Sequence, residues 1–122
     1  MDTPQHITRE QFAELVHDAL NHLYDSHYLR EHPLAHMLLS ADTGSEALRS
    51  QNLRRTLLDA IHRMRPTIPR PENSPDWRGY RILMLRYVQG LQPTEIMEQL
   101  TMARSVYFRE QARALELSLI HI

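Results

Sequence analysis

Apolar residues recur every three or four positions over most of the chain, which is the spacing of an amphipathic helix. Two stripes are the clearest. One runs through residues 8–24 (Phe12, Leu15, Val16, Ala19, Leu20 and Leu23) and the other through residues 46–64 (Leu53, Leu57, Leu58, Ile61 and Met64). No long stretch alternates apolar and polar residues as a half-buried strand does. We therefore predict an all-α fold, in which the first stripe packs on the second near Leu57 and Ile61.

Signals for helix starts set the boundaries in the first half. Thr8 and Gln11 have the spacing of a capping box, in which two side chains satisfy free amides at a helix start. The segment DSHYLREHP interrupts the first helix after residue 24. Pro33 fits the first turn of a short helix over residues 33–40, where an amide hydrogen is not needed. ADTGSE is expected to be a loop before the helix over residues 46–64.

The segment RPTIPRPENSP divides the chain. Four of its eleven residues are proline, so it is neither a helix nor a central strand. We expect an acidic helical segment over residues 1–65, an extended connector over residues 66–76, and a second unit over residues 77–117.

Four boundaries are expected in the second unit. Asp76 is placed to cap a helix over residues 77–89, whose buried face carries Trp77 and Tyr80. Gly90 is placed to end that helix in the left-handed conformation. A short helix follows over residues 93–100, with Pro93 in its first turn. Residues 101–103 form a break, and the last helix is expected over residues 104–117.

Charge is unevenly divided along the chain, although the net charge is only −1. Residues 1–53 hold three arginines and eight acidic residues, whereas residues 54–113 hold eleven arginines and six acidic residues. The basic part indicates a polyanionic partner. All basic residues are arginine, which binds phosphate and guanine edges with two parallel hydrogen bonds. A GC-rich coding sequence is the alternative explanation for the lack of lysine.

The last expected helices follow the order of a helix-turn-helix: a long helix, a short helix, a three-residue turn and a basic helix. Within them, the segments LRYVQG, TEIMEQL and RAL have the spacing found in one family. Residues 77–117 resemble region four of bacterial sigma factors and the related helix-turn-helix domains of transcription regulators. The resemblance implies a bacterial, cytoplasmic transcription regulator, or the N-terminal module of one, that binds double-stranded DNA. RNA polymerase or a second copy of the chain is a further expected partner.

The same resemblance implies roles for individual residues. Arg104, Ser105 and Arg109 fall where the family places base-contacting side chains. Arg113 is expected on the same helix face as Arg104, two and a half turns further on, where it reaches a phosphate. Tyr107 falls at a buried position. The alternative is that these arginines form a solvated face.

Three residues depart from the family pattern. Met97 stands where a small residue is preferred, because two helices cross closely there. Thr101 stands where glycine is preferred in the turn. Ala103 stands where a capping serine or threonine is preferred, so one helix cap worth about 0.5–2 kcal/mol is expected to be absent.

A second class of function fits the same features. Residues 8–64 loosely resemble the helical segment that precedes such a domain in larger bacterial signalling regulators. The chain would then be a helical protein-protein interaction module of such a regulator. The final letters, LSLIHI, resemble translated sequencing-adapter read-through, so residues 118–122 are expected to be a non-native tail.

Enzymatic activity is not expected, and neither is a cofactor, a metal, a membrane contact or a small-molecule substrate. The three scattered glycines form no phosphate-binding loop, and no serine lies in a nucleophile-elbow setting. The absence of cysteine excludes disulfides and thiolate metal sites. His32 and His36 have helical i, i+4 spacing, but Pro33 lies between them and no third ligand follows at metal-site spacing.

Overall fold

The computed structural model describes residues 7–38 and 46–122, and the elements in these ranges are all helical. The prediction of an all-α fold is confirmed for this part of the chain. The elements are α1 (Arg9–Asn21), α2 (Ser26–Arg30), α3 (Pro33–Leu38), α4 (Glu46–His62), α5 (Pro75–Leu83), the π-helix η1 (Met84–Val88), α6 (Pro93–Leu100), α7 (Arg104–Ser118) and the 3-10 helix η2 (Leu119–His121).

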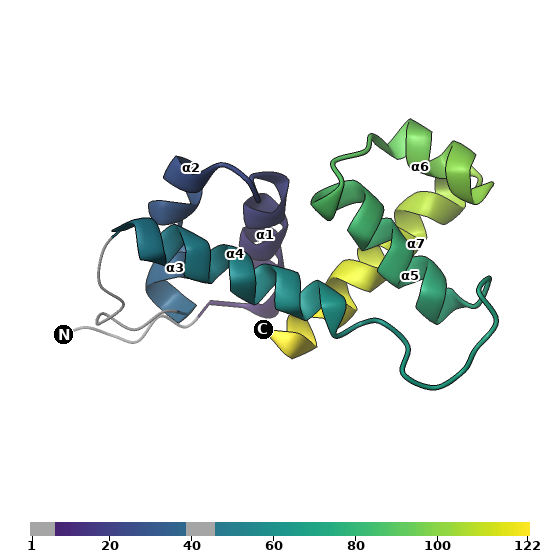
Figure 1. The fold of residues 1–122 in the computed structure, drawn as a ribbon, viewed down its shortest axis with the longest axis horizontal. Helices are drawn as coiled ribbons and strands as arrows, with labels where there is room; N and C mark the ends of the chain where they lie inside the picture. The colour runs from purple at the N-terminus through teal and green to yellow at the C-terminus, as the bar shows by residue number, and fades with distance from the viewer. Residues whose placement is uncertain (1–6, 39–45) are drawn as a thin grey trace.

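Figure 1 shows how the helices are arranged. Helices α1, α2 and α3 gather around the first part of α4, and α5, α6 and α7 form a second group. The last turns of α4 and the C-terminal end of α7 meet between the two groups. No helix in the described ranges has both the length and the apolar character needed to cross a membrane.

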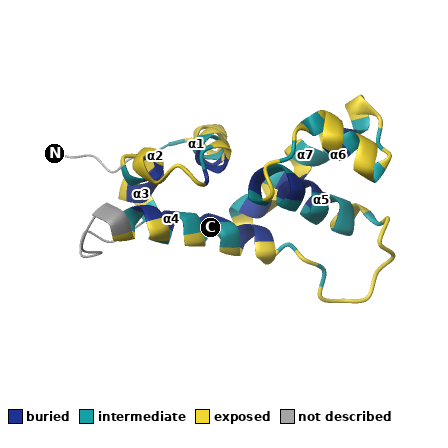
Figure 2. Ribbon diagram, turned by 45° about the horizontal axis from the view of Figure 1, so that its top comes forward, coloured by how far each residue is buried: buried dark blue, intermediate teal, exposed yellow. Residues whose placement is uncertain are grey.

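The larger of two hydrophobic clusters joins these groups. Its buried residues come from every helix between α1 and α7 except α6: Val16, Ala19, Leu20, Leu23, Leu29, Leu34, Ala35, Leu53, Leu57, Ile61, Leu83, Tyr87 and Ala114. The expected packing of the first stripe with Leu57 and Ile61 is therefore confirmed. Gly79 allows α5 to approach α7 closely, because a Cβ atom at residue 79 would stand 3.4 Å from the Cβ of Ala114. Figure 2 shows the buried residues facing the interior of both groups.

The second cluster is smaller and lies under α6. Its buried residues are Ile82, Leu85, Ile96 and Tyr107, and Leu91, Met97, Leu100 and Met102 pack around them. The continuous helix formed by α5 and η1 contributes to both clusters. Ile82 and Leu85 belong to the small cluster, whereas Leu83 and Tyr87 belong to the large one. The two clusters therefore share this helix.

Several helix boundaries agree with the sequence analysis. Thr8 accepts a hydrogen bond from the Gln11 amide, and the Gln11 side chain accepts one from the Thr8 amide, so the predicted capping box is present. Pro33 begins α3 and Pro93 begins α6. Gly90 has a φ of +76°, the left-handed conformation predicted for it. The loop expected at residues 41–46 lies outside the described residues, except for Glu46, which begins α4.

Other boundaries correct the sequence analysis. The DSHYLREHP segment contains α2, a five-residue helix capped by Asp25 and anchored by the fully buried Leu29. Asp76 does not cap α5. Ser74 does, and Asp76 instead pairs with Arg70 at 3.3 Å. The helix expected to run regularly to residue 89 changes to a π-helix at Met84, where the Gln89 amide donates to the Met84 carbonyl.

The aromatic residues of α5 are only partly buried. Tyr80 packs against the large cluster, as predicted. Trp77 belongs to neither cluster and contacts Tyr80 edge-on. Two guanidinium groups, those of Arg65 and Arg81, lie over its ring at 5.9 Å from the centroid. The prediction that Trp77 is a core residue is therefore wrong, because its ring lies outside both clusters, beside the guanidinium groups of Arg65 and Arg81.

Residues 118–122 pack against the rest of the protein. Ser118 is buried, and its hydroxyl donates to the Leu115 carbonyl at 2.7 Å. Leu119 and Ile122 pack against the large cluster. The segment therefore packs on the large cluster. Its non-native origin stays a prediction.

Candidate nucleic-acid interface

Helices α6 and α7 are joined by a tight turn over residues 101–103. Thr101 adopts the left-handed conformation, with φ and ψ both 56°. This conformation lets the Thr101 amide donate to the Glu98 carbonyl (3.3 Å) and the Met102 amide donate to the Met97 carbonyl (2.8 Å). These two bonds satisfy carbonyls that the end of α6 would leave free. The turn therefore has a defined geometry even though it lacks the glycine that the family prefers.

The start of α7 has no side-chain cap. Ala103 has the extended backbone of an N-cap residue, but no side-chain hydrogen bond closes the first turn. The missing cap expected from the sequence is therefore confirmed. Amides of an uncapped first turn are open to water or to an anionic ligand. α6, by contrast, is closed by Glu95, whose carboxylate accepts from the Gln92 amide at 2.8 Å.

The sequence-predicted site residues on α7 are all exposed: Arg104, Ser105, Arg109 and Arg113. In the described part of the chain, no ion pair forms with Arg104, Arg109 or Arg113. The guanidinium of Arg104 lies over the ring of Phe108, 5.0 Å from its centroid. These side chains therefore present positive charge that no ion pair with the described residues neutralises.

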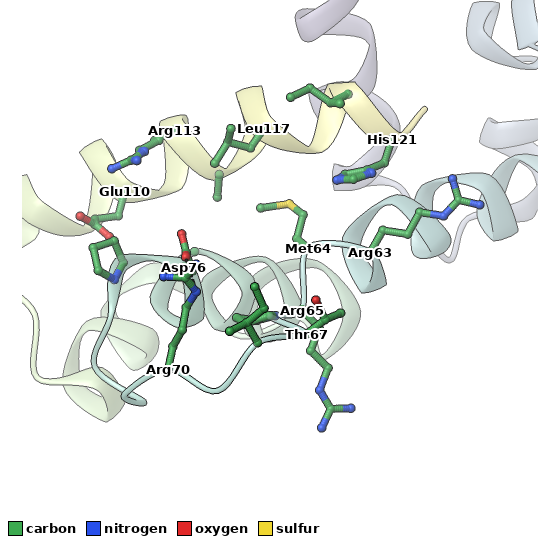
Figure 3. A pocket seen from close by; sticks show the side chains of 16 residues that line it. Arg63, Met64, Arg65, Thr67, Arg70, Asp76, Glu110, Arg113, Leu117 and His121 are labelled. Atoms are coloured by element: carbon green, nitrogen blue, oxygen red, sulfur yellow. Dashed lines mark ion pairs between the residues drawn. The ribbon is translucent and has the colours of Figure 1, made fainter.

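Arg113 does not lie on the same face as Arg104. An α-helix turns about 100° per residue, so nine residues place two side chains on opposite sides. Figure 3 shows Arg113 beside Glu110, at an open pocket of about 330 Å³ that is lined by the residues following α4, the connector, α5, α7 and η2. The expected shared face with Arg104 is therefore wrong. Arg109, four residues before Arg113, lies on nearly the same side of the helix as Arg113.

Other arginines of the basic half hold the fold together. Arg78 bonds Glu110 of α7 at 3.2 Å, and Arg81 bonds Glu72 of the connector at 3.1 Å. Arg54 donates to the Leu23 carbonyl at 2.7 Å, linking α4 to the end of α1. The positive charge of residues 54–113 is therefore not one uniform surface, because many of its arginines are bound internally.

Two tyrosines lie at the buried side of α7. Tyr107 is fully buried, as the resemblance implied, and burial raises the pKa of its hydroxyl. On the next turn, the Gln111 side chain donates to the hydroxyl of Tyr87 at 3.0 Å, and burial raises the pKa of Tyr87 to about 12. Both hydroxyls therefore stay neutral at physiological pH. These contacts hold one side of α7 against the protein and thereby set which of its residues are exposed.

The two histidines with metal-ligand spacing are not placed together. His36 is exposed, whereas His32 is buried and accepts a hydrogen bond from the Leu34 amide on its Nδ1 (3.1 Å). That bond caps the start of α3 and leaves the proton on Nε2, which donates to Asp18 (3.0 Å). Within the ranges that the structure describes, no group of three histidine, aspartate or glutamate side chains is arranged to hold a metal ion.

Asp18, which is partly exposed, is the centre of this network. It also accepts a hydrogen bond of 2.6 Å from the hydroxyl of Tyr28. The bond from Tyr28 and the neighbouring His32 lower the pKa of Asp18 below its ordinary value. The network ties α1, α2 and α3 together, so its residue types serve stability.

Comparisons with protein-family models, with curated proteins and with solved structures find no match to this chain. The functional argument therefore depends on the geometry of α6 and α7, on the charges that α7 exposes, and on the resemblance described above.

Proposed function

We propose that this protein binds double-stranded DNA sequence-specifically, as a bacterial transcription regulator or the N-terminal module of one. In this proposal α6 and α7 form a helix-turn-helix, and α7 enters the major groove. Its role is binding in the cytoplasm and not catalysis. RNA polymerase or a second copy of the chain is a further proposed partner.

One observation carries this proposal: the buried side of α7 is packed in the protein, while its exposed surface holds arginines that form no ion pair with the described residues. Ile96 and Tyr107 lock α6 to α7 in the small cluster. Arg104 and Arg109 lie about 140° apart around α7. Both are exposed, and neither forms an ion pair with the described residues. Side chains that reach a groove must be held by such packing, because a mobile helix would lose entropy on binding.

Fluorescence anisotropy across a salt series, on a site selected from random duplexes and on a scrambled one, tests the proposal. Arg109→Ala should weaken binding to the selected site by about 1–3 kcal/mol and relax its sequence preference, because arginine reads guanine with two hydrogen bonds. Arg113→Ala should weaken both duplexes alike and reduce the slope of log affinity against log salt by about one unit, as the loss of a phosphate contact does.

Arg55→Ala is the matched control, because Arg55 is an exposed arginine on α4, outside the proposed interface. It should bind both duplexes like the parent. If the parent binds no duplex, or binds with no dependence on salt, the alternative function is favoured: a helical protein-protein interaction module. An Arg55 variant as weak as the Arg109 variant would show that binding depends only on overall charge.

A further inference from the structure

Phe108 is an exposed aromatic residue on α7 that the sequence analysis did not assign to the site. Its side chain is 41% exposed and belongs to neither hydrophobic cluster. The ring is nevertheless held on two sides. It meets the buried ring of Tyr107 edge-on, with centroids 4.9 Å apart, and the guanidinium of Arg104 lies over it at 5.0 Å. Phe108 is therefore a fixed apolar surface in contact with water.

The position of this ring matches the face proposed to enter the groove. Phe108 follows Arg104 by four residues, so both lie on one side of the first two turns of α7. Ser105 and Ala112, also exposed, lie further round the same outer surface. The exposed ring thus lies under the Arg104 guanidinium, on a part of α7 that is not buried as Tyr107 and Ala114 are.

The chemistry of the major groove offers one strong apolar feature, the C5-methyl group of thymine. Guanine presents two acceptors that suit a guanidinium. Because the Arg104 guanidinium lies only 5.0 Å from the centre of the Phe108 ring, the two side chains would reach neighbouring base pairs. Resting on the proposed function, we propose that Phe108 is a specificity-determining residue that contacts a thymine methyl next to a guanine read by Arg104.

Deoxyuridine provides a direct test, because it differs from thymidine only by that methyl group. The full chain selects its preferred duplex from a random pool, and each thymine is then replaced singly by deoxyuridine. We expect one replacement, beside a guanine, to weaken binding by about fourfold, the factor that corresponds to burying one methyl group. Phe108→Ala should bind the thymine and deoxyuridine duplexes equally, and Phe108→Leu should retain part of the difference.

Ile68→Ala is the control, since Ile68 is an apolar residue of the connector that is 62% exposed. This variant should keep the fourfold difference. If the parent binds every deoxyuridine duplex as tightly as the thymine duplex, or if Phe108→Ala keeps the difference, the proposal for Phe108 is wrong while DNA binding stands. If the parent selects no duplex, both proposals are overturned, and the exposed ring is better explained by contact with another protein.

Discussion

The turn between α6 and α7 contains a residue with a strained backbone, and one substitution should relieve that strain. Thr101 is the only non-glycine residue with positive φ in the described part of the chain. For an L-residue the left-handed conformation costs about 1–2 kcal/mol, and a β-branched side chain makes it a clear outlier. The Thr101 side chain is exposed and forms no hydrogen bond with the described residues, so its removal should cost little stability.

Thr101→Gly is therefore expected to stabilise the protein. Glycine relieves the strain, but it also increases the entropy of the unfolded chain, which costs about 0.5–1 kcal/mol. The difference leaves a net gain of about 0.5–1 kcal/mol in the free energy of unfolding. For a chain of this size, that gain corresponds to an increase in Tm of about 2–4 °C. Urea denaturation and differential scanning calorimetry would both measure it.

Gly90 provides the matched control, because it has a similar conformation with φ of +76° and nothing lies within 4 Å of the position of an added Cβ. Gly90→Ala should therefore introduce backbone strain without a steric clash, and destabilise the protein by about 1 kcal/mol. The reasoning is refuted if Thr101→Gly is no more stable than the parent while Gly90→Ala behaves as expected. That outcome would mean that the threonine makes a compensating interaction in the turn.

Two further predictions concern the first group of helices. Leu20→Asp should destabilise the fold by about 3–5 kcal/mol in urea denaturation, because Leu20 is buried in the large cluster and a charge there has no partner. The same change at the exposed Met37 should cost about 0.5 kcal/mol or less. Equal losses for the two variants would contradict the packing of α1 in the large cluster. Asp18→Asn should destabilise the protein at neutral pH. The lowered pKa of Asp18 provides stability that is present above its unfolded value of about 3.9 and lost as pH falls through the folded value. The gap between parent and variant should therefore narrow below about pH 4, and a gap independent of pH would show that the charge of Asp18 is not involved.

Local signals in the sequence were enough to predict several helix starts and stops. The Thr8 capping box, the start of α6 at Pro93 and the left-handed Gly90 each depend on residues within one turn of each other. Such interactions can be read from spacing because no distant part of the chain has to be known. The α5 cap shows the limit of this reasoning. Ser74 precedes Pro75, a common helix start, and caps the helix, whereas the sequence analysis predicts Asp76 as the cap.

Features that depend on tertiary contacts could not be predicted. α2 has only one buried apolar residue, Leu29, and is too short to show a periodic stripe. Its mostly polar sequence therefore predicts a break between helices and not a helix. The cap that His32 provides to α3 requires Asp18 of α1 to orient the ring. For the candidate site, the exposure of Arg104 and Arg109 agrees with the sequence analysis. Arg113 instead lies half a turn from its predicted face, and the exposure of the Phe108 ring depends on tertiary packing that the sequence does not indicate.

The continuous helix of α5 and η1, which the two clusters share, affects whether the C-terminal helices can exist as an independent module. In a chain cut at the connector, the face of α5, η1 and α7 that carries Leu83, Tyr87 and Ala114 would lose its partners from α1 to α4 and lie open to water. Exposure of that face would favour aggregation or unfolding over an autonomous fold. The two groups of helices should therefore melt in a single cooperative transition.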